Sequence, residues 1–75
     1  MQFEELCTII AEVLDVEEDT ITLETRFIDD LGADSLDLFQ IVSEVEDRLS
    51  IQVPEDALEE IVTVEDALNA INEVD

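Results

Sequence analysis

Residues 34–49 read DSLDLFQIVSEVEDRL, and they have the pattern of one amphipathic helix. Apolar residues recur at the three- and four-residue spacing that places side chains on one helical face. They are Leu38, Val42, Val45 and Leu49, with Ile41 at their flank. Asp34 suits the N-cap position, because its carboxylate can accept hydrogen bonds from the first free N–H groups of a helix. The pattern predicts a helix over residues 35–49, with Ser35 in its first turn.

The residues before this stretch predict another helix and a long loop. A helix over residues 3–15 is indicated by an apolar stripe made of Phe3, Leu6, Cys7, Ile10, Val13 and Leu14. Ile9 falls outside that stripe and has no assigned place. Residues 16–34 keep no helical period, although they include Ile21, Leu23, Phe27, Ile28 and Leu31. They predict a loop that dips into the core, and Gly32, the only glycine, lies where the backbone must turn into the next helix.

The residues after the stretch predict two further helices. Pro54 suits the start of a short helix over residues 54–60. Thr63 and Asp66 resemble a capping box with Asp in place of Glu, and they open a helix over residues 63–73. Its inward side chains are Val64, Ala67, Leu68 and Ile71. We expect an all-α fold, a small four-helix bundle with a long loop between the first two helices and a short third helix, in one domain of residues 1–75.

The charge of the chain limits its partners. Twenty-three acidic residues face two basic ones, Arg26 and Arg48, for a formal net charge of −21. This balance argues against binding to nucleic acid, which needs Lys and Arg, and against insertion into anionic membranes. It favours partner proteins with basic patches and a chain that stays monomeric, although solubility alone is an equally good explanation of the acids. Because 47% of residues are hydrophobic and patterned, we expect a folded but self-repelling protein.

The residues needed for catalysis are missing from the sequence. There is no histidine, so the usual general base and the usual metal ligand are absent. Ser35 lacks the flanking glycines of a hydrolase elbow, and the acids before Gly32 do not match a calcium loop. Cys7 is the only cysteine, so no internal disulfide forms. We expect no catalytic residues, no metal site and, without a targeting segment, a cytoplasmic protein.

Two features of the second helix argue against an ordinary structural role for Ser35. Leu36 points about 160° and Phe39 about 100° away from the centre of the buried stripe, so both lie on an outer surface bordered by acids. Such a surface resembles a docking site with apolar anchors and a charged rim, unless Phe39 folds back over a loop. A serine in a first turn is also well placed to carry a phosphodiester, since the helix N-terminus favours an anion.

The segment Leu31-Gly32-Ala33-Asp34-Ser35-Leu36-Asp37 resembles the signature around the modified serine of acyl carrier proteins. The resemblance extends over nearly the whole chain, including Phe27 and the Val53-Pro54 pair. It implies that 4′-phosphopantetheine is joined to Ser35 by a phosphodiester. A phosphopantetheinyl transferase (holo-acyl-carrier-protein synthase) would install it from coenzyme A. The thiol of the arm would then carry acyl groups as thioesters.

The same resemblance assigns the partner-binding residues. Asp34 and Leu36 would be read by the transferase and by other partners. A second set on the same helix would face the basic patches of ketoacyl synthases, reductases, dehydratases and acyltransferases, and it comprises Asp37, Phe39, Gln40, Glu46 and Asp47. Gln40 stands where many relatives have an acid, and Ser43 stands where an apolar residue is common. The partner surface is therefore expected to be less acidic and less hydrophobic at these two points.

The resemblance favours a free-standing carrier of fatty acid synthesis that is not itself an enzyme. The chain begins with its own Met1 and has no flanking linker, which supports this reading. A carrier of a polyketide or other specialised thioester pathway is the alternative. A peptidyl or D-alanyl carrier fits less well, as does a binding module that has lost the arm. The bundle core is expected to part slightly to shelter an acyl chain, at a gain of about 0.8 kcal/mol per buried CH₂.

Overall fold

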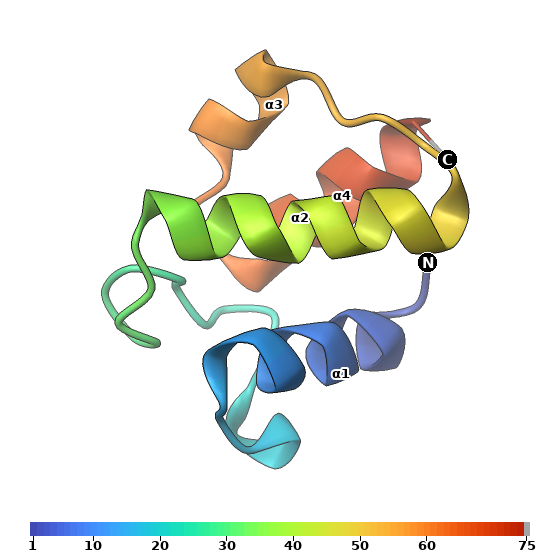
Figure 1. The fold of residues 1–75 in the computed structure, drawn as a ribbon. Helices are drawn as coiled ribbons and strands as arrows, with labels where there is room; N and C mark the ends of the chain where they lie inside the picture. Colours follow the sequence, from blue (N-terminus) through green and yellow to red (C-terminus); the bar gives the residue numbers. More distant parts are fainter. Residues whose placement is uncertain (75) are drawn as a thin grey trace.

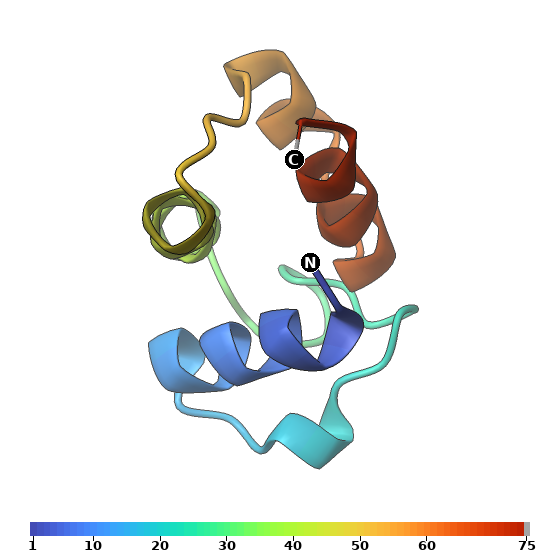
Figure 2. The same cartoon turned by 90° about the vertical axis from the view of Figure 1, so that its right-hand side faces the viewer.

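Four α-helices and one short 3₁₀ helix make up the part of the chain that the computed structural model describes, residues 1–74. They are α1 (Phe3–Leu14), η1 (Glu18–Thr20), α2 (Ser35–Leu49), α3 (Glu55–Glu60) and α4 (Val64–Val74). In Figure 1, α2 crosses the middle of the molecule, with α1 below it, α3 above it and α4 behind. Figure 2 shows α2 end-on, with α1 and α4 on the other sides of the core. The predicted four-helix architecture with a short third helix is confirmed.

The bounds of the four α-helices agree with the predicted ones to within one residue, although the C-caps of α1 and α2 were not predicted. α2 has the predicted bounds, and Asp34 is its N-cap. α1 ends one residue early because Asp15 adopts the left-handed conformation, with φ of 57°, and Ser50 closes α2 in the same way. Pro54 is the N-cap of α3 and not its first helical residue. Thr63 and Asp66 form the expected capping box, so α4 begins at Val64.

The buried face of α1 is broader than the predicted stripe. Ile9, which had no place in that stripe, is 1% exposed and lies in the core beside Leu6, Cys7 and Ile10. Phe3, Val13 and Leu14 are only half-buried. α1 packs against α2 on one side and against η1 on another, so two of its faces are shielded from solvent. A single helical stripe describes a helix with one neighbour and therefore missed Ile9.

The buried face of α2 is rotated from the predicted stripe toward Ile41. Ile41, Val42 and Val45 are buried, whereas Leu38 and Leu49 at the two ends are half-buried. Val64, Ala67 and Ile71 of α4 face them from across the core. The three longer helices thus contribute mainly branched aliphatic side chains to the core.

The loop over residues 16–34 enters the core as expected, and it contains a 3₁₀ turn, η1, that was not predicted. Ile21 and Phe27 are buried, but Leu23 and Ile28 are exposed. Backbone hydrogen bonds tie the loop to the junction between α3 and α4. The Phe27 N–H donates to the Val62 carbonyl at 3.0 Å, and the Val64 N–H donates to the Thr25 carbonyl at 2.9 Å. The loop that leads to Ser35 is therefore held in place by hydrogen bonds to the junction between α3 and α4.

None of the helices within residues 1–74 combines the length and the apolar character that crossing a bilayer requires.

Candidate functional site

The N-terminus of α2 is fixed by a reciprocal pair of hydrogen bonds. The Asp37 N–H donates to Asp34 Oδ1 at 2.9 Å, and the Asp34 N–H donates to Asp37 Oδ2 at 3.3 Å. The chain reaches this cap through Gly32, whose φ of +67° is a conformation that L side chains rarely adopt. The Ala33 N–H donates to the Phe27 carbonyl at 2.9 Å and anchors the turn to the buried loop. Backbone geometry thus fixes the position of the next residue, Ser35.

Ser35 is the first residue of α2 and is exposed to solvent. Its own N–H and that of Leu36 precede the first intrahelical hydrogen bond, as the first N–H groups of any helix do. Neither donates to an acceptor within residues 1–74. Together with the positive end of the helix dipole, these two N–H groups favour an anion on the Ser35 hydroxyl. The carboxylates of Asp34 and Asp37 oppose one, so a cation from a partner would complete the balance of charge.

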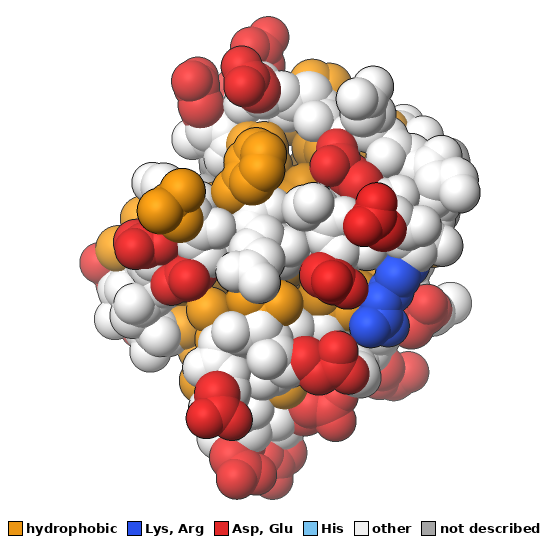
Figure 3. All heavy atoms as spheres, viewed as in Figure 1, with side chains coloured by type: hydrophobic (Ala, Val, Ile, Leu, Met, Phe, Trp, Pro, Cys, Tyr) orange, Lys and Arg blue, Asp and Glu red, His pale blue; other side chains and the backbone are white. Residues whose placement is uncertain are grey.

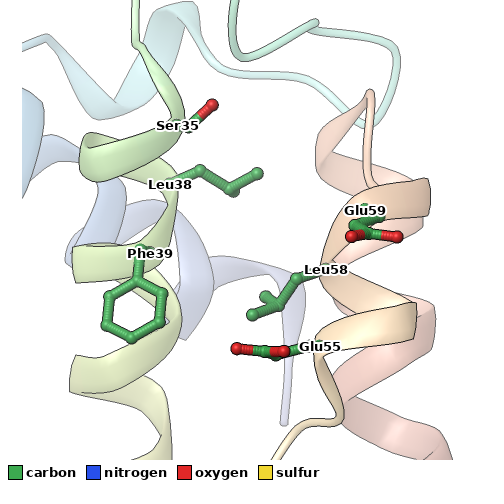
Figure 4. Close-up of a pocket in the computed structure, with 6 residues that line it drawn as sticks. All are labelled: Ser35, Leu38, Phe39, Glu55, Leu58 and Glu59. Atoms are coloured by element: carbon green, nitrogen blue, oxygen red, sulfur yellow. The ribbon is translucent and has the colours of Figure 1, made fainter.

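A groove beside Ser35 separates α2 from α3. This Ser35 groove has a volume of about 300 Å³ and is lined by Ser35, Leu38, Phe39, Glu55, Leu58 and Glu59. Figure 4 shows Leu38 and Leu58 extending toward each other from the two helices, with the Glu55 carboxylate reaching from α3 toward α2. The lining is mixed: Leu38, Phe39 and Leu58 are apolar, and the acidic groups lie on the α3 side. An exposed hydroxyl, unpaired amides and an adjoining groove fit the attachment of a long, anionic, flexible group.

The groove continues along α2 away from Ser35. A distal groove of about 400 Å³ shares Phe39, Glu55 and Leu58 with the first. Its remaining lining residues come from α2 and from the link between α2 and α3, and they are Val42, Glu46, Gln52, Val53 and Pro54. The two grooves therefore adjoin along the space between α2 and α3, one beside Ser35 and the other beside the link at residues 52–54.

The outer surface of α2 carries exposed apolar side chains, as the helical geometry predicted. Leu36 is 77% exposed and Phe39 is 58% exposed. Phe39 stands at the mouth of the Ser35 groove and does not fold back over the loop (Figure 4). In Figure 3, apolar side chains near the start of α2 lie among acidic ones. Gln40 and Asp47 are exposed on the same helix, and Asp47 lies about 18 Å along the axis from Ser35, at 1.5 Å per residue.

Glu46 and Asp37 differ from the other predicted partner-binding residues, which are exposed. Glu46 is half-buried, and its Oε2 accepts a hydrogen bond from the Val53 N–H at 2.7 Å. Asp37 is also half-buried, because its carboxylate serves the α2 cap. Both acids thus have a structural partner as well as a position on the α2 surface. Of the predicted site residues, Asp34, Ser35, Leu36 and Asp37 cluster at the N-terminus of α2, and Phe39 lies beside Ser35 in the groove.

The α3 side of the groove was not predicted. Glu55, Leu58 and Glu59 line the Ser35 groove, but α3 has only six residues and none of them is buried. So short a helix carries too few apolar residues to show which face turns toward α2. Pro54 was the one available signal, because it marked where this helix begins.

The described part of the chain holds no other obvious chemical centre. Within residues 1–74, no three His, Cys, Asp or Glu side chains are grouped to hold a metal ion. Cys7 is buried in α1 at 5% exposed. Burial raises the pKa of its thiol, and the negative charges of Glu18 and Glu4 raise the pKa further. Cys7 therefore stays in its unreactive thiol form at neutral pH.

Comparisons with known proteins agree with this geometry. The family model of the phosphopantetheine attachment site matches residues 4–71. Acyl carrier proteins from three strains of Clostridium perfringens are each 45% identical to the chain over 71 residues, which cover 95% of this chain and 93% of each relative. Among solved structures, one assigned as an acyl carrier protein from Mycobacterium tuberculosis superposes with a TM-score of 0.87 at 33% identity. That match covers 96% of this chain and 97% of the other.

The agreement of fold, attachment-site model and sequence identity fixes both the family and its cofactor. Acyl carrier proteins carry groups for other enzymes and do not themselves catalyse the transfer, and the matched model is the attachment site of phosphopantetheine. The chain belongs to the acyl carrier protein family.

Proposed function

We propose that residues 1–75 act as one carrier domain that holds growing fatty acyl chains as thioesters on 4′-phosphopantetheine attached to Ser35. The observation that carries this proposal is the position of the Ser35 hydroxyl. It is exposed at the first residue of α2, beside two unpaired N–H groups, and it opens onto the Ser35 groove. Ser43, by contrast, is half-buried in the helix interior, and Ser50 closes its far end.

Each residue around Ser35 has a task that follows from its chemistry. The N–H groups of Ser35 and Leu36 stabilise the negative charge of a phosphodiester. Asp34 holds the helix start rigid through the cap and so fixes the direction of the hydroxyl. When bound, the arm supplies a thiol, with a pKa of about 8.5 when free, which the chain itself does not offer at its surface. Leu38, Phe39 and Leu58 give the arm and its cargo apolar surface to lie against.

The partners in this proposal are enzymes with basic surfaces. They comprise a phosphopantetheinyl transferase, which loads the arm, and the ketoacyl synthases, reductases, dehydratases and acyltransferases of fatty acid synthesis. The net charge of −21 supports the proposal, because opposite potentials steer two proteins together. Leu36 and Phe39 supply apolar anchors within the acidic surface. The cytoplasm suits such a carrier, because thiols stay reduced there.

A mass measurement tests the attachment residue. The chain is incubated with coenzyme A and a promiscuous phosphopantetheinyl transferase and then weighed intact. We expect the wild type to gain the mass of one phosphopantetheine group and Ser35→Ala to gain nothing. Ser43→Ala and Ser50→Ala are matched controls, because these are the other two serines of the chain. A gain that persists in Ser35→Ala would show that another side chain is modified.

The cargo is tested separately from the attachment. Chain purified from its native host is weighed under conditions that preserve thioesters. A series of saturated and β-oxidised acyl masses on the arm supports fatty acid synthesis. Acyl masses that do not belong to such a series would assign the carrier to a polyketide or other specialised pathway.

A further inference from the structure

Glu46 adds a side-chain hydrogen bond between two parts of the molecule, α2 and the link that follows it, where Val53 also packs into the core with Val42 and Val45. It lies in the last turns of α2, beside exposed Asp47, and its Oε2 accepts from the Val53 N–H at 2.7 Å. Val53 belongs to the link between α2 and α3 and is buried. Within residues 1–74, this is the hydrogen bond that a side chain of α2 makes to the link.

The position of α3 depends on that link. α3 has six residues, none of them buried, and its N-cap, Pro54, makes no side-chain capping bond. The helix packs against α4, whereas α2 faces it across the two grooves. Val53 directly precedes Pro54, so the Glu46 bond holds the backbone from which α3 starts. Glu46 and Val53 also line the distal groove. Loosening their hydrogen bond would therefore let α3, which forms the opposite wall of this groove, move more easily.

The strength of this bond depends on the charge of the carboxylate. Hydrogen bonds to an ionised acceptor are roughly twice as strong as those between neutral groups. A cation that pairs with the carboxylate competes for the same lone pairs. Glu46 is only half-buried, so a Lys or Arg side chain arriving at the outer surface of α2 can reach it.

We propose that Glu46 is a positioning residue that couples the acidic surface of α2 to the wall of the groove. Its free carboxylate holds Val53 and keeps α3 in place. When a basic side chain of an enzyme pairs with Glu46, the bond to Val53 weakens and α3 moves away from α2. Docking thereby opens the groove at the moment when an enzyme needs the cargo. This inference rests on the proposed function for the basic partner, but the latch itself is a property of the chain alone.

Amide hydrogen exchange on the full chain tests the latch. Glu46→Gln keeps an acceptor of the same size and removes the charge, and Glu46→Ala removes the acceptor as well. Asp47→Asn is the matched control, because it removes one charge from the neighbouring exposed residue. We expect exchange at Val53 and along α3 to be faster by about tenfold in Glu46→Ala, which loses one partly buried charge-assisted bond, and intermediate in Glu46→Gln. Equal exchange in Glu46→Gln and Asp47→Asn would refute the role of the charge.

A cation built into α2 tests the coupling. Ser43 lies three residues before Glu46, where side chains on a helix are neighbours, so Ser43→Lys brings an ammonium group to the carboxylate. Ser43→Gln adds polar bulk without charge and is the control. We expect Val53 and α3 to exchange several-fold faster in Ser43→Lys than in Ser43→Gln, and the difference to vanish when Glu46→Gln is added. Equal exchange in the two Ser43 variants would overturn the proposal. Because no arm is needed, the result is independent of modification at Ser35.

Discussion

Asp66 is the acid whose charge is most directly used to hold the backbone at the start of α4. Its Oδ2 accepts from the N–H groups of Val62 and Thr63, each at 3.1 Å. The hydrogen bond from Thr63 and then that from Val62 lower the pKa of this carboxyl below its usual range. The ionised form is therefore favoured in the folded state, and it contributes stability that protonation removes.

We predict that Asp66→Ala destabilises the fold by about 1 kcal/mol at neutral pH, the usual cost of a lost helix cap. The folded pKa lies below the unfolded value of about 3.9, so the contribution is complete above that value. It disappears as the pH falls through the folded pKa, and the two proteins then converge. Urea unfolding between pH 7 and pH 2.5 measures this difference.

Glu65→Gln is the control for that measurement, because it removes a neighbouring exposed charge without a capping bond. A deficit in Asp66→Ala that stays constant down to pH 2.5 would contradict the assignment of the stability to the ionised carboxylate.

Individual site residues differ in how far the sequence reveals them. Asp34 was correctly predicted as the N-cap and Ser35 as the first residue of α2, because a helix cap is set by neighbours along the chain. The hydrogen bond between Glu46 and Val53 was not predicted, because Val53 lies across a turn that no helical period describes. Ile9 was left out for a related reason, since the number of neighbours packed around α1 is a property of the tertiary structure.

At the scale of one element, substitutions on the outer face of α2 are expected to affect partner docking much more than the stability of the fold. Leu36 and Phe39 are exposed, so truncating them removes little packing. We predict that Leu36→Ala and Phe39→Ala each change the free energy of unfolding by less than about 0.5 kcal/mol, as is usual for surface positions. We expect the same changes to slow modification by the transferase about tenfold or more, since apolar anchors dominate the energy of an interface.

Initial rates of phosphopantetheine transfer, together with urea unfolding, measure both effects. Val62→Ala is the matched control, because Val62 is 54% exposed but lies between α3 and α4. Rates for Leu36→Ala and Phe39→Ala that equal the rate for Val62→Ala would remove the docking role from this face.

The bounds of the elements were largely predictable, and their mutual arrangement was not. α2 and α4 have strong caps and regular apolar spacing, so their limits follow from local chemistry. η1 was missed because its three residues, Glu18–Thr20, are polar and bury nothing. The α3 wall of the groove was missed because a six-residue helix has too few turns to show a preferred face.

At the scale of the whole molecule, the net charge of −21 destabilises the fold through repulsion between acidic side chains. Each of the two arginines already pairs with two acids, Arg26 with Asp29 and Asp30, and Arg48 with Glu12 and Glu44, at 3.4–3.7 Å. These pairs are exposed and individually weak. The molecule measures 26 × 21 × 19 Å, which is shorter than the Debye length of about 30 Å at 10 mM salt. All of its acids therefore repel one another in low salt.

We predict that the melting temperature rises by several degrees between 10 mM and 1 M NaCl, where the Debye length falls to about 3 Å. Mg²⁺ should act at lower concentration because of its higher charge. A variant with Glu24, Glu65 and Glu73 changed to Gln serves as the control, since it carries three fewer exposed charges. It should melt higher in low salt and respond less to added salt, and a flat salt profile for the wild type would argue against repulsion.

The burial of Cys7 has a consequence for how the protein can be studied. A folded chain whose one cysteine is inaccessible gives no signal with a maleimide dye. Once the arm is installed, its tip adds a single labelling position, and acylation masks that position again. Fluorescence after brief labelling would then measure the fraction of chains whose arm carries no acyl group. Cys7 would not need to be mutated to prevent background labelling.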